Sequence, residues 1–180
     1  MKVRLVPVVL QNKPGPKGLA SPNIAFVKEQ CYWPENIGLT DKFTSKFVIQ
    51  NTGDADADVF LALTYKGKHY LFSWEAGGVT VPLAAGSMGT ATMTDITIQE
   101  ILTNIEVITE TTTLEFLFVT GYAIGTGEAQ QFWSQDSWSV RTYVKVAGVL
   151  PVPTSYLLVA ALGLVGVGGG VYLLKKRKKK

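Results

Sequence analysis

The sequence predicts an all-β domain, folded as an antiparallel β-sandwich, followed by one C-terminal transmembrane helix. Short runs rich in Thr, Val, Ile and aromatic residues alternate with Gly, Asn, Asp and Pro, which is the pattern of strands joined by turns. About eight such runs recur every ~8–12 residues, and this spacing is typical of a sandwich. Near the C-terminus, 19 uncharged residues precede six consecutive basic residues, which indicates a membrane span and its flank.

The formal net charge of +3 conceals two parts of opposite sign. All of residues 175–180 are basic, whereas residues 1–174 contain 11 basic and 14 acidic residues and so carry −3. The chain has 180 residues, of which 47% are hydrophobic and 17% charged. This composition excludes a disordered, highly charged chain, and the confinement of positive charge to the tail excludes a uniformly basic nucleic-acid binder.

The N-terminal residues predict an arm on a linker. Residues 3–10 are apolar enough for a strand, and the Pro and Gly residues of 12–22 resist regular structure. Because Pro7 has no N–H to donate, the strand is expected at a sheet edge. Three outcomes stay open, since the arm can pair with its own sheet, pair with a neighbouring copy, or remain unpaired.

The clearest strand covers residues 138–146, at the end of the body. Apolar residues and Thr142 alternate there with polar residues, with Trp138 and Val144 on the inward face and Arg141 on the outward face. Other strands are expected at 46–50, with Phe47 and Ile49 facing inward, and at 59–65, with its apolar residues 59, 61, 63 and 65 on one face. Further strands are expected at 23–29, 69–74, 78–83, 87–94, 113–124 and 130–133. The spacing of Ile98, Ile101, Leu102 and Ile105 predicts a short helix within 97–105, with a strand as the alternative.

The uncharged segment at 156–174 predicts the membrane span. As a helix, its 19 residues are roughly 28 Å long, close to the ~30 Å thickness of the hydrocarbon layer. Tyr156 and Tyr172 lie near the ends, where aromatic rings favour the interface. A buried soluble helix is the alternative, but five glycines in eight positions would make a poor one. Gly166 and Gly170 form one G-x-x-x-G pair, which is a weak signal for helix pairing.

The basic tail has two candidate ligands beyond its role in stopping membrane transfer. It consists of Lys175, Lys176, Arg177, Lys178, Lys179 and Lys180. Such a cluster attracts anionic lipid, and in a virion it would neutralise nucleic-acid phosphates without reading their sequence.

Charge around the span predicts its orientation. The stalk at 148–155 is uncharged, so the positive-inside rule places the basic tail in the cytoplasm and the body outside. However, Pro7 interrupts the apolar stretch after Arg4, and this N-terminus lacks the apolar core of a signal peptide. The chain is therefore expected either to be exported by another route or to insert by its tail with the body in the cytosol.

The residues of catalytic chemistry are sparse. With one histidine, His69, and one cysteine, Cys31, the chain can form neither an intramolecular disulfide nor a Cys/His zinc set. It also lacks a G-x-S-x-G elbow and a phosphate-binding glycine loop. The sequence therefore predicts a protein that is not an enzyme and carries no cofactor.

Two further sets of residues are candidate binding sites. Asp54, Asp56 and Asp58 alternate with alanine and are weak candidates for a calcium site, with a solvated polar turn as the alternative. Trp33, Phe132 and Trp133 lie beside polar or Pro-containing stretches and are candidate contacts for a partner protein, with core packing as the alternative.

Two segments resemble the immunoglobulin-like modules of the CARDB (cell adhesion related) type found in bacterial and archaeal surface proteins. They are FVIQNTGDADADVFLAL at 47–63 and DSWSVRTYVKV at 136–146, with the run VTVPLAAGSMG between them. The resemblance implies an immunoglobulin-like β-sandwich over residues 23–147 and a non-catalytic role as a spacer or adhesion unit.

The sequence thus predicts a single-pass membrane protein with a structural or interaction role. It divides into an arm and linker at 1–22, a sandwich at 23–147, a stalk at 148–155, a span at 156–174 and a tail at 175–180. Its expected partners are the lipid bilayer and neighbouring structural proteins, from a capsid or surface layer, or a second copy of itself. A virion membrane is the favoured location, and a prokaryotic cell envelope is the alternative.

Overall fold

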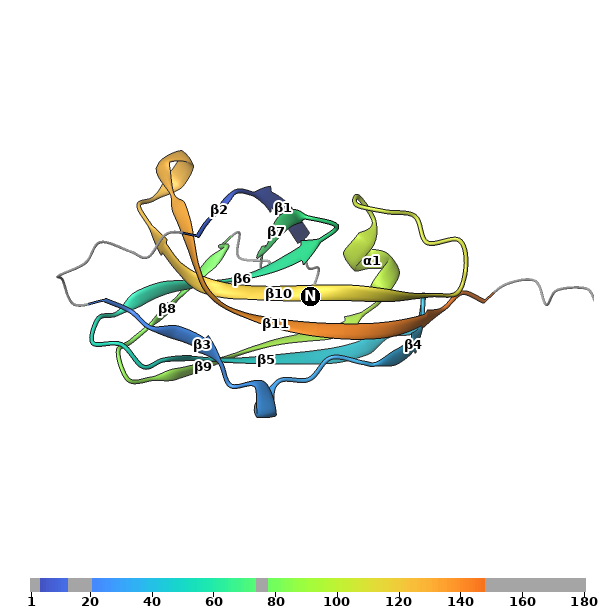
Figure 1. Cartoon of the computed structure of the whole chain (residues 1–180), viewed down its shortest axis with the longest axis horizontal. Helices are drawn as coiled ribbons and strands as arrows, with labels where there is room; N and C mark the ends of the chain where they lie inside the picture. Colours follow the sequence, from blue (N-terminus) through green and yellow to red (C-terminus); the bar gives the residue numbers. More distant parts are fainter. Residues whose placement is uncertain (1–3, 13–20, 74–77, 148–180) are drawn as a thin grey trace, which may run out of the picture. The chain divides into compact units, whose positions relative to one another are not determined.

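The computed structural model describes residues 4–12, 21–73 and 78–147, which form a sandwich of two β-sheets (Figure 1). The smaller sheet has the order β3-β5-β9. Its strands are β3 (Ile24–Phe26), β5 (Phe43–Asn51) and β9 (Met88–Ile96). This all-β architecture is the one that the strand spacing predicts.

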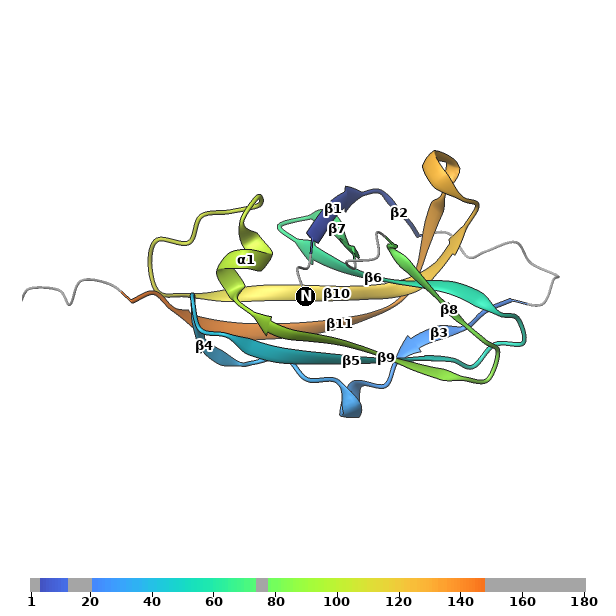
Figure 2. The same cartoon turned by 180° about the vertical axis from the view of Figure 1, so that it is seen from behind.

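The larger sheet follows the order β1-β7-β6-β10-β11-β2. Two short strands lie beside this path, β8 on the edge of β6 that also carries β7, and β4 on the edge of β11 that also carries β2. The bounds are β1 (Arg4–Val8), β2 (Leu10–Gln11), β4 (Asn36–Gly38), β6 (Ala57–Tyr65), β7 (Lys68–Ser73), β8 (Thr80–Leu83), β10 (Thr112–Ile124) and β11 (Gln131–Lys145). Seen from behind, β8 crosses from the larger sheet toward β9 (Figure 2).

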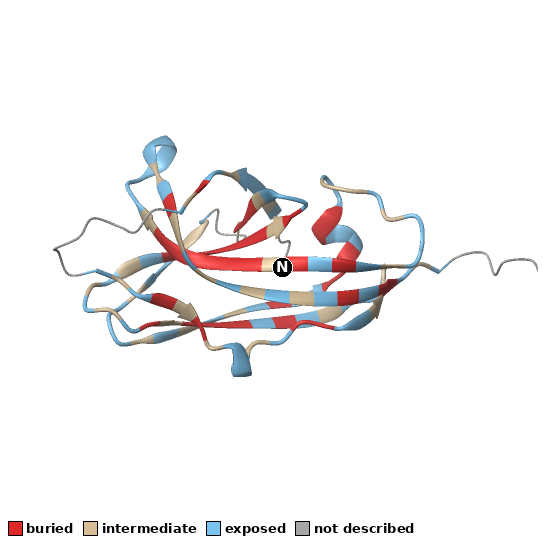
Figure 3. Cartoon of the chain, in the orientation of Figure 1, coloured by how far each residue is buried: buried red, intermediate tan, exposed pale blue. Residues whose placement is uncertain are grey.

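An aromatic cluster fills the space between the two sheets. The ring of Trp33 lies 4.7 Å from that of Phe118 and 5.3 Å from that of Phe116, centroid to centroid. Phe47 from the smaller sheet lies 4.7 Å from Phe118 of the larger one. Buried residues occur along the strands of both sheets (Figure 3), and the largest of them are apolar side chains, whose burial favours folding.

The alternation of 138–146 is confirmed. In β11, Thr142 and Val144 are buried and Trp138 is half-buried, whereas Arg141 and Tyr143 are exposed. The strands predicted at 46–50, 59–65 and 113–124 lie within β5, β6 and β10, and those predicted at 78–83 and 87–94 overlap β8 and β9. The strand expected at 69–74 is β7, which ends at Ser73, since residue 74 lies outside the described segments.

The helical spacing at 97–105 is also confirmed, over a shorter range. Helix α1 covers Ile98–Leu102 and buries Ile98, Ile101 and Leu102. Thr97 and Glu100 form a capping box, in which each side chain bonds the backbone N–H of the other residue. This cap explains why so short a helix forms beside a long strand. Two 3-10 turns, η1 (Lys28–Gln30) and η2 (Gly127–Ala129), complete the described helical structure.

The arm pairs with its own sheet, and at both of that sheet's edges. β1 pairs antiparallel with β7, and β2 pairs parallel with Phe132 and Trp133 of β11. Since only Val9 separates β1 from β2, the arm crosses the outer face of the sheet (Figure 1). There Leu10 joins a second buried cluster, which the sequence did not predict. Its buried members are Leu10, Phe60, Ala62, Leu71, Val119 and Phe132.

A bulge between Thr120 and Gly121 bends the β10–β11 hairpin beside this second cluster. A side chain at 121 would drive its Cβ into the carbonyl oxygen of Trp133, so only glycine fits there. The bend carries Phe132 onto the outer face, where it packs edge-on against Phe60 at 5.5 Å. The two buried clusters therefore lie on opposite faces of one sheet.

Among residues 4–12, 21–73 and 78–147, no helix is long and apolar enough to cross a membrane. Several predicted parts of the chain lie outside those segments. They are residues 13–20 of the linker, the stalk at 148–155, the span at 156–174 and the tail at 175–180.

Candidate functional site

The candidate site is found by comparing the edges of the two sheets. An edge strand presents unpaired backbone N–H and C=O groups, which recruit another strand unless something blocks them. The described edges differ in how they are blocked, and this difference defines the candidate site.

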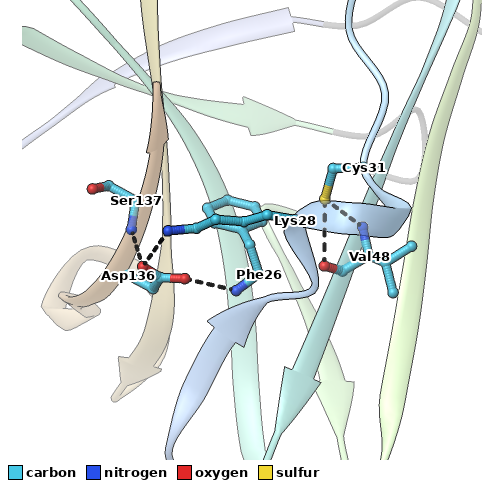
Figure 4. A network of polar contacts seen from close by, with 6 residues as sticks. All are labelled: Phe26, Lys28, Cys31, Val48, Asp136 and Ser137. Atoms are coloured by element: carbon cyan, nitrogen blue, oxygen red, sulfur yellow. Dashed lines mark hydrogen bonds and ion pairs between the residues drawn. The ribbon is translucent and has the colours of Figure 1, made fainter. Parts of the chain in front are cut away.

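Side chains from β11 cover the edge of β3. Gln135 accepts a hydrogen bond from the backbone N–H of Ile24 at 2.7 Å, and Asp136 accepts one from the N–H of Phe26 at 2.9 Å. The other carboxylate oxygen of Asp136 lies 3.4 Å from the ammonium of Lys28 and accepts the N–H of Ser137 (Figure 4). These bonds join the two sheets at this edge and leave β3 no free donors at Ile24 and Phe26.

Cys31 belongs to the same region but serves the neighbouring strand. Its sulfur lies 3.3 Å from the backbone nitrogen of Val48 and 3.7 Å from the carbonyl oxygen of that residue (Figure 4). Burial raises the pKa of the Cys31 thiol, and the hydrogen bond from Val48 opposes that rise. A thiol with a raised pKa is a poor nucleophile at neutral pH.

Proline or short length protects the edges of the larger sheet. β1 carries Pro7, which has no N–H, and β8 carries Pro82. β2 and β4 contain two and three residues, too few for an extended partner strand. Each of these features is a recognised way of blocking edge-to-edge pairing.

β9 has none of these protections. It is nine residues long and pairs, among the strands that the structure describes, only with β5. Residues 88–94 contain no proline and no charged side chain. The regular pairing of β9 with β5 is interrupted after Met93, because the register shifts between Ser45 and Phe43 of β5.

The hydrogen bonds of β5 show which groups of β9 face outward. Lys46 exchanges both backbone bonds with Tyr32, and the carbonyl of Val48 accepts from Val27. These residues therefore point away from β9, so their pairing partners Thr92 and Thr90 point away from β5. The backbone groups of Thr90 and Thr92 face the open edge, and their side chains are exposed.

A small apolar hollow of about 70 Å³ opens beside this edge. It lies where the smaller sheet ends at β9 and the larger one ends at β8, so the two sheets are not closed against each other here. Val81 on its rim is 54% exposed. The lining residues include Ile49, Val59, Leu61, Val81, Leu83 and Ala91.

Tyr65, Lys66 and Glu106 form a polar cluster at the surface of the domain. The phenol of Tyr65 donates to one oxygen of Glu106 at 2.6 Å, and Lys66 lies 2.6 Å from the other. These two hydrogen bonds lower the pKa of Glu106, whereas burial and the Glu106 carboxylate raise the pKa of Tyr65 far above its usual value. The cluster ties the segment after α1 to the β6–β7 turn and holds its phenol protonated.

A hollow of about 800 Å³ lies between β1 and the segment around α1. Its polar lining includes Arg4, Asp95 and Glu100. Glu100 is already engaged in the cap of α1, where it bonds Thr97. One of the two carboxylates in this lining, that of Glu100, therefore already serves the fold.

The three aspartates proposed for calcium are used separately. Asp54 accepts the N–H of Ser21 at 2.8 Å, and Asp56 accepts the N–H of Ala85 at 2.9 Å, whereas Asp58 lies within β6. In the described segments, no group of three or more His, Cys, Asp or Glu side chains is placed to hold a metal ion. The calcium interpretation is therefore corrected, because the first two carboxylates bond backbone amides of different loops.

The prediction of exposed aromatic contacts was wrong for two of its three residues. Trp33 is 4% exposed, and its indole N–H donates to the hydroxyl of Thr142 at 2.9 Å. Phe132 is 7% exposed in the second cluster, and Trp133 is half-buried against the main core with its indole nitrogen enclosed. For Trp33 and Phe132 the alternative of core packing is the correct one. The sequence did not predict the open edge of β9, because a local hydrophobic pattern does not say which strands pair with each other.

No protein-family model and no curated protein sequence matches the chain. Among solved structures, a CARDB domain from Pyrococcus furiosus in complex with di-metal ions is similar, with 11% identity and a TM-score of 0.41 over 71% of this chain and 94% of that one. A β-glucosidase from Listeria innocua in complex with glucose gives 15% identity and a TM-score of 0.38 over 70% of this chain and 16% of that one. A β-glucosidase from Erythrobacter marinus gives 15% and 0.36 over 74% and 18%. These are likenesses of fold alone.

Proposed function

We propose that this chain is a non-enzymatic, membrane-anchored β-sandwich that holds an interaction surface beside a lipid bilayer. The observation that carries the proposal is the 19-residue uncharged segment at 156–174, which follows a folded β domain and precedes six basic residues. In this proposal the lipid bilayer is one partner of the chain, and a neighbouring structural protein or a second copy is the other.

The arrangement of the strands supports an immunoglobulin-like sandwich for the domain. β3, β5 and β9 share one sheet, and β6, β10 and β11 share the other. This division matches the A-B-E and C-F-G sheets of the immunoglobulin fold in both order and pairing. A domain of this kind is a rigid support, and its function resides in its edges and loops.

The way polar groups are used supports a non-enzymatic role. Asp136 and Gln135 bond backbone amides, Glu106 bonds Tyr65 and Lys66, and Glu100 caps a helix. Each of these groups already has structural partners. The single described imidazole, His69, lies 2.7 Å from the hydroxyl of Thr64 on the outer face of the larger sheet.

We favour a virion membrane as the setting, with the domain linking that membrane to a capsid or forming a spike. Its basic tail would then face packaged nucleic acid or anionic lipid. In the alternative, a prokaryotic cell envelope, the positive-inside rule places the domain outside.

Protease protection tests the anchor and the setting together. Full-length chain carrying one epitope tag at each terminus is expressed in a prokaryotic host, and intact cells are treated with protease before immunoblotting. We expect the chain in the membrane fraction after carbonate washing. A variant with leucines 157, 158, 173 and 174 replaced by lysine is the control and should leave that fraction. Recovery of the wild-type chain in the soluble fraction would overturn the anchor, and digestion of the domain from outside would favour the cell envelope.

A further inference from the structure

We propose that β9 joins two copies of this chain, pairing antiparallel with β9 of a second copy so that their smaller sheets form one continuous sheet. The proposal rests on the edge of β9 and does not depend on the membrane anchor. It commits to a second copy as the occupant of this edge.

The contrast among the edges is the first step. Pro7 and Pro82 interrupt β1 and β8, and the side chains of Gln135 and Asp136 cover β3. Among the described edges, only β9 presents seven consecutive residues, 88–94, without a proline or a charged side chain. A long unblocked edge is a site of strand addition, and natural sandwiches usually block such edges. Within the described residues, β9 is therefore the edge best suited to the addition of a strand.

The backbone geometry gives the second step. The N–H and C=O groups of Thr90 and Thr92 face away from β5. When two copies run antiparallel about Ala91, each Thr90 lies opposite the partner's Thr92, and these pairs exchange four backbone hydrogen bonds. Ala91 then faces the partner's Ala91 in a non-hydrogen-bonded pair, where Cα atoms are only about 4.5 Å apart and small side chains fit best.

The side chains explain why the occupant is a second copy. Between Met88 and Thr94 the strand carries no charge, so a two-fold axis through Ala91 brings no like charges together. The threonines are β-branched and pair well with one another across strands. The same surface thus complements itself, as a two-fold interface requires. A partner of different sequence would gain nothing from this symmetry.

The hollow beside the edge adds a third observation. Its apolar lining, which includes Val81 and Ala91, is open to water in a single copy. A second strand along β9 extends the smaller sheet past this opening and covers its rim. Burial of that apolar surface adds to the backbone bonds in favouring the dimer.

Paired charge variants test the register directly. The full-length chain is purified in detergent and its mass is measured by light scattering over a range of concentrations, with cross-linking as a second readout. The wild type is expected to be a dimer. In T90K/T92K each new lysine lies opposite another, which should weaken dimerisation about tenfold or more. In T90K/T92E opposite charges face each other, so the dimer should persist.

The controls separate folding from pairing. T113K places a lysine on an exposed threonine of β10, in the other sheet, and should remain dimeric. Thermal melting of T90K/T92K at low concentration should match that of the monomeric wild type, since both positions are exposed. A monomeric wild type at all concentrations overturns the proposal. So does equal behaviour of the two charge variants, whether both remain dimeric or both dissociate. Membrane binding does not enter these readouts, so failure here leaves the anchor standing.

Discussion

At the scale of single residues, the indole of Trp33 depends on one hydroxyl in β11. Thr142 is fully buried, accepts the indole N–H and donates to the carbonyl of Pro34 at 2.9 Å. T142V keeps the shape of the side chain but leaves both partners unpaired in the core. We expect the free energy of unfolding to fall by about 1–3 kcal/mol. Denaturant titration followed by tryptophan fluorescence measures this loss, and T113V on the exposed face of β10 should change it by less than about 0.5 kcal/mol.

Glu106 predicts a dependence of stability on pH. Its pKa is lowered in the folded chain by hydrogen bonds from Lys66 and Tyr65, so the unfolded chain binds its proton more readily. The stabilisation is therefore fully present above the unfolded pKa, about 4.3, and is lost as pH falls through the lower folded value. Thermal melting between pH 3 and pH 7 should show E106Q losing less stability on acidification than the wild type. K66Q should lie between the two, and identical acid profiles for all three would contradict the assignment.

The sequence identified the residues of the core better than those of the surface. Phe47 and Ile49 point inward as predicted, because alternation is a local property of a strand. Trp33 was misassigned because its neighbours, Tyr32 and Pro34, are exposed or conformationally restricted, whereas its burial comes from contacts with β10 and β11. The roles of the aspartates likewise depend on loops distant in sequence, such as the one at Ala85 that bonds Asp56.

At the scale of elements, the arm stabilises the domain by covering the outer face of the larger sheet. Leu10 packs into the second cluster, whereas Val9 beside it is 76% exposed. L10A should therefore lower the free energy of unfolding by about 2 kcal/mol or more, and V9A should have little effect. Denaturant titration of the two variants in parallel provides the measurement. Equal effects would mean that the arm does not pack on the sheet in solution.

Strand β6, which the arm covers, shows what the local sequence pattern could not predict. Residues 59–65 were assigned one buried face, yet Phe60 and Ala62 on the opposite face are also buried. The run VFLALTY is almost continuously apolar, which is a signal for a strand covered on both faces. What the sequence could not show is which segment supplies the second cover, since the arm lies about 50 residues away in the chain.

At the scale of the whole molecule, the charge distribution assigns different roles to the two ends of the chain. Residues 1–174 carry −3 and all six positive charges of the tail follow the uncharged segment. In the described domain, Lys28, Lys66 and Arg141 form ion pairs with carboxylates of the same domain. Six consecutive positive charges are thus concentrated at 175–180, where the proposed anchor would place them beside a membrane span.

This concentration predicts that the tail determines which side of the membrane holds the domain. Replacing all six basic residues of 175–180 by glutamine removes the charge asymmetry around the span but leaves its 19 uncharged residues intact. We expect the variant to remain in the membrane fraction with a mixed orientation, because the bias of Lys and Arg sets topology whereas hydrophobicity sets insertion. A variant with every tail lysine changed to arginine keeps the charge and should keep the wild-type orientation. Protease digestion of intact cells, with epitopes at both ends, gives the fraction in each orientation. An unchanged single orientation for the glutamine variant would show that the folded domain, and not the tail, decides which side it occupies.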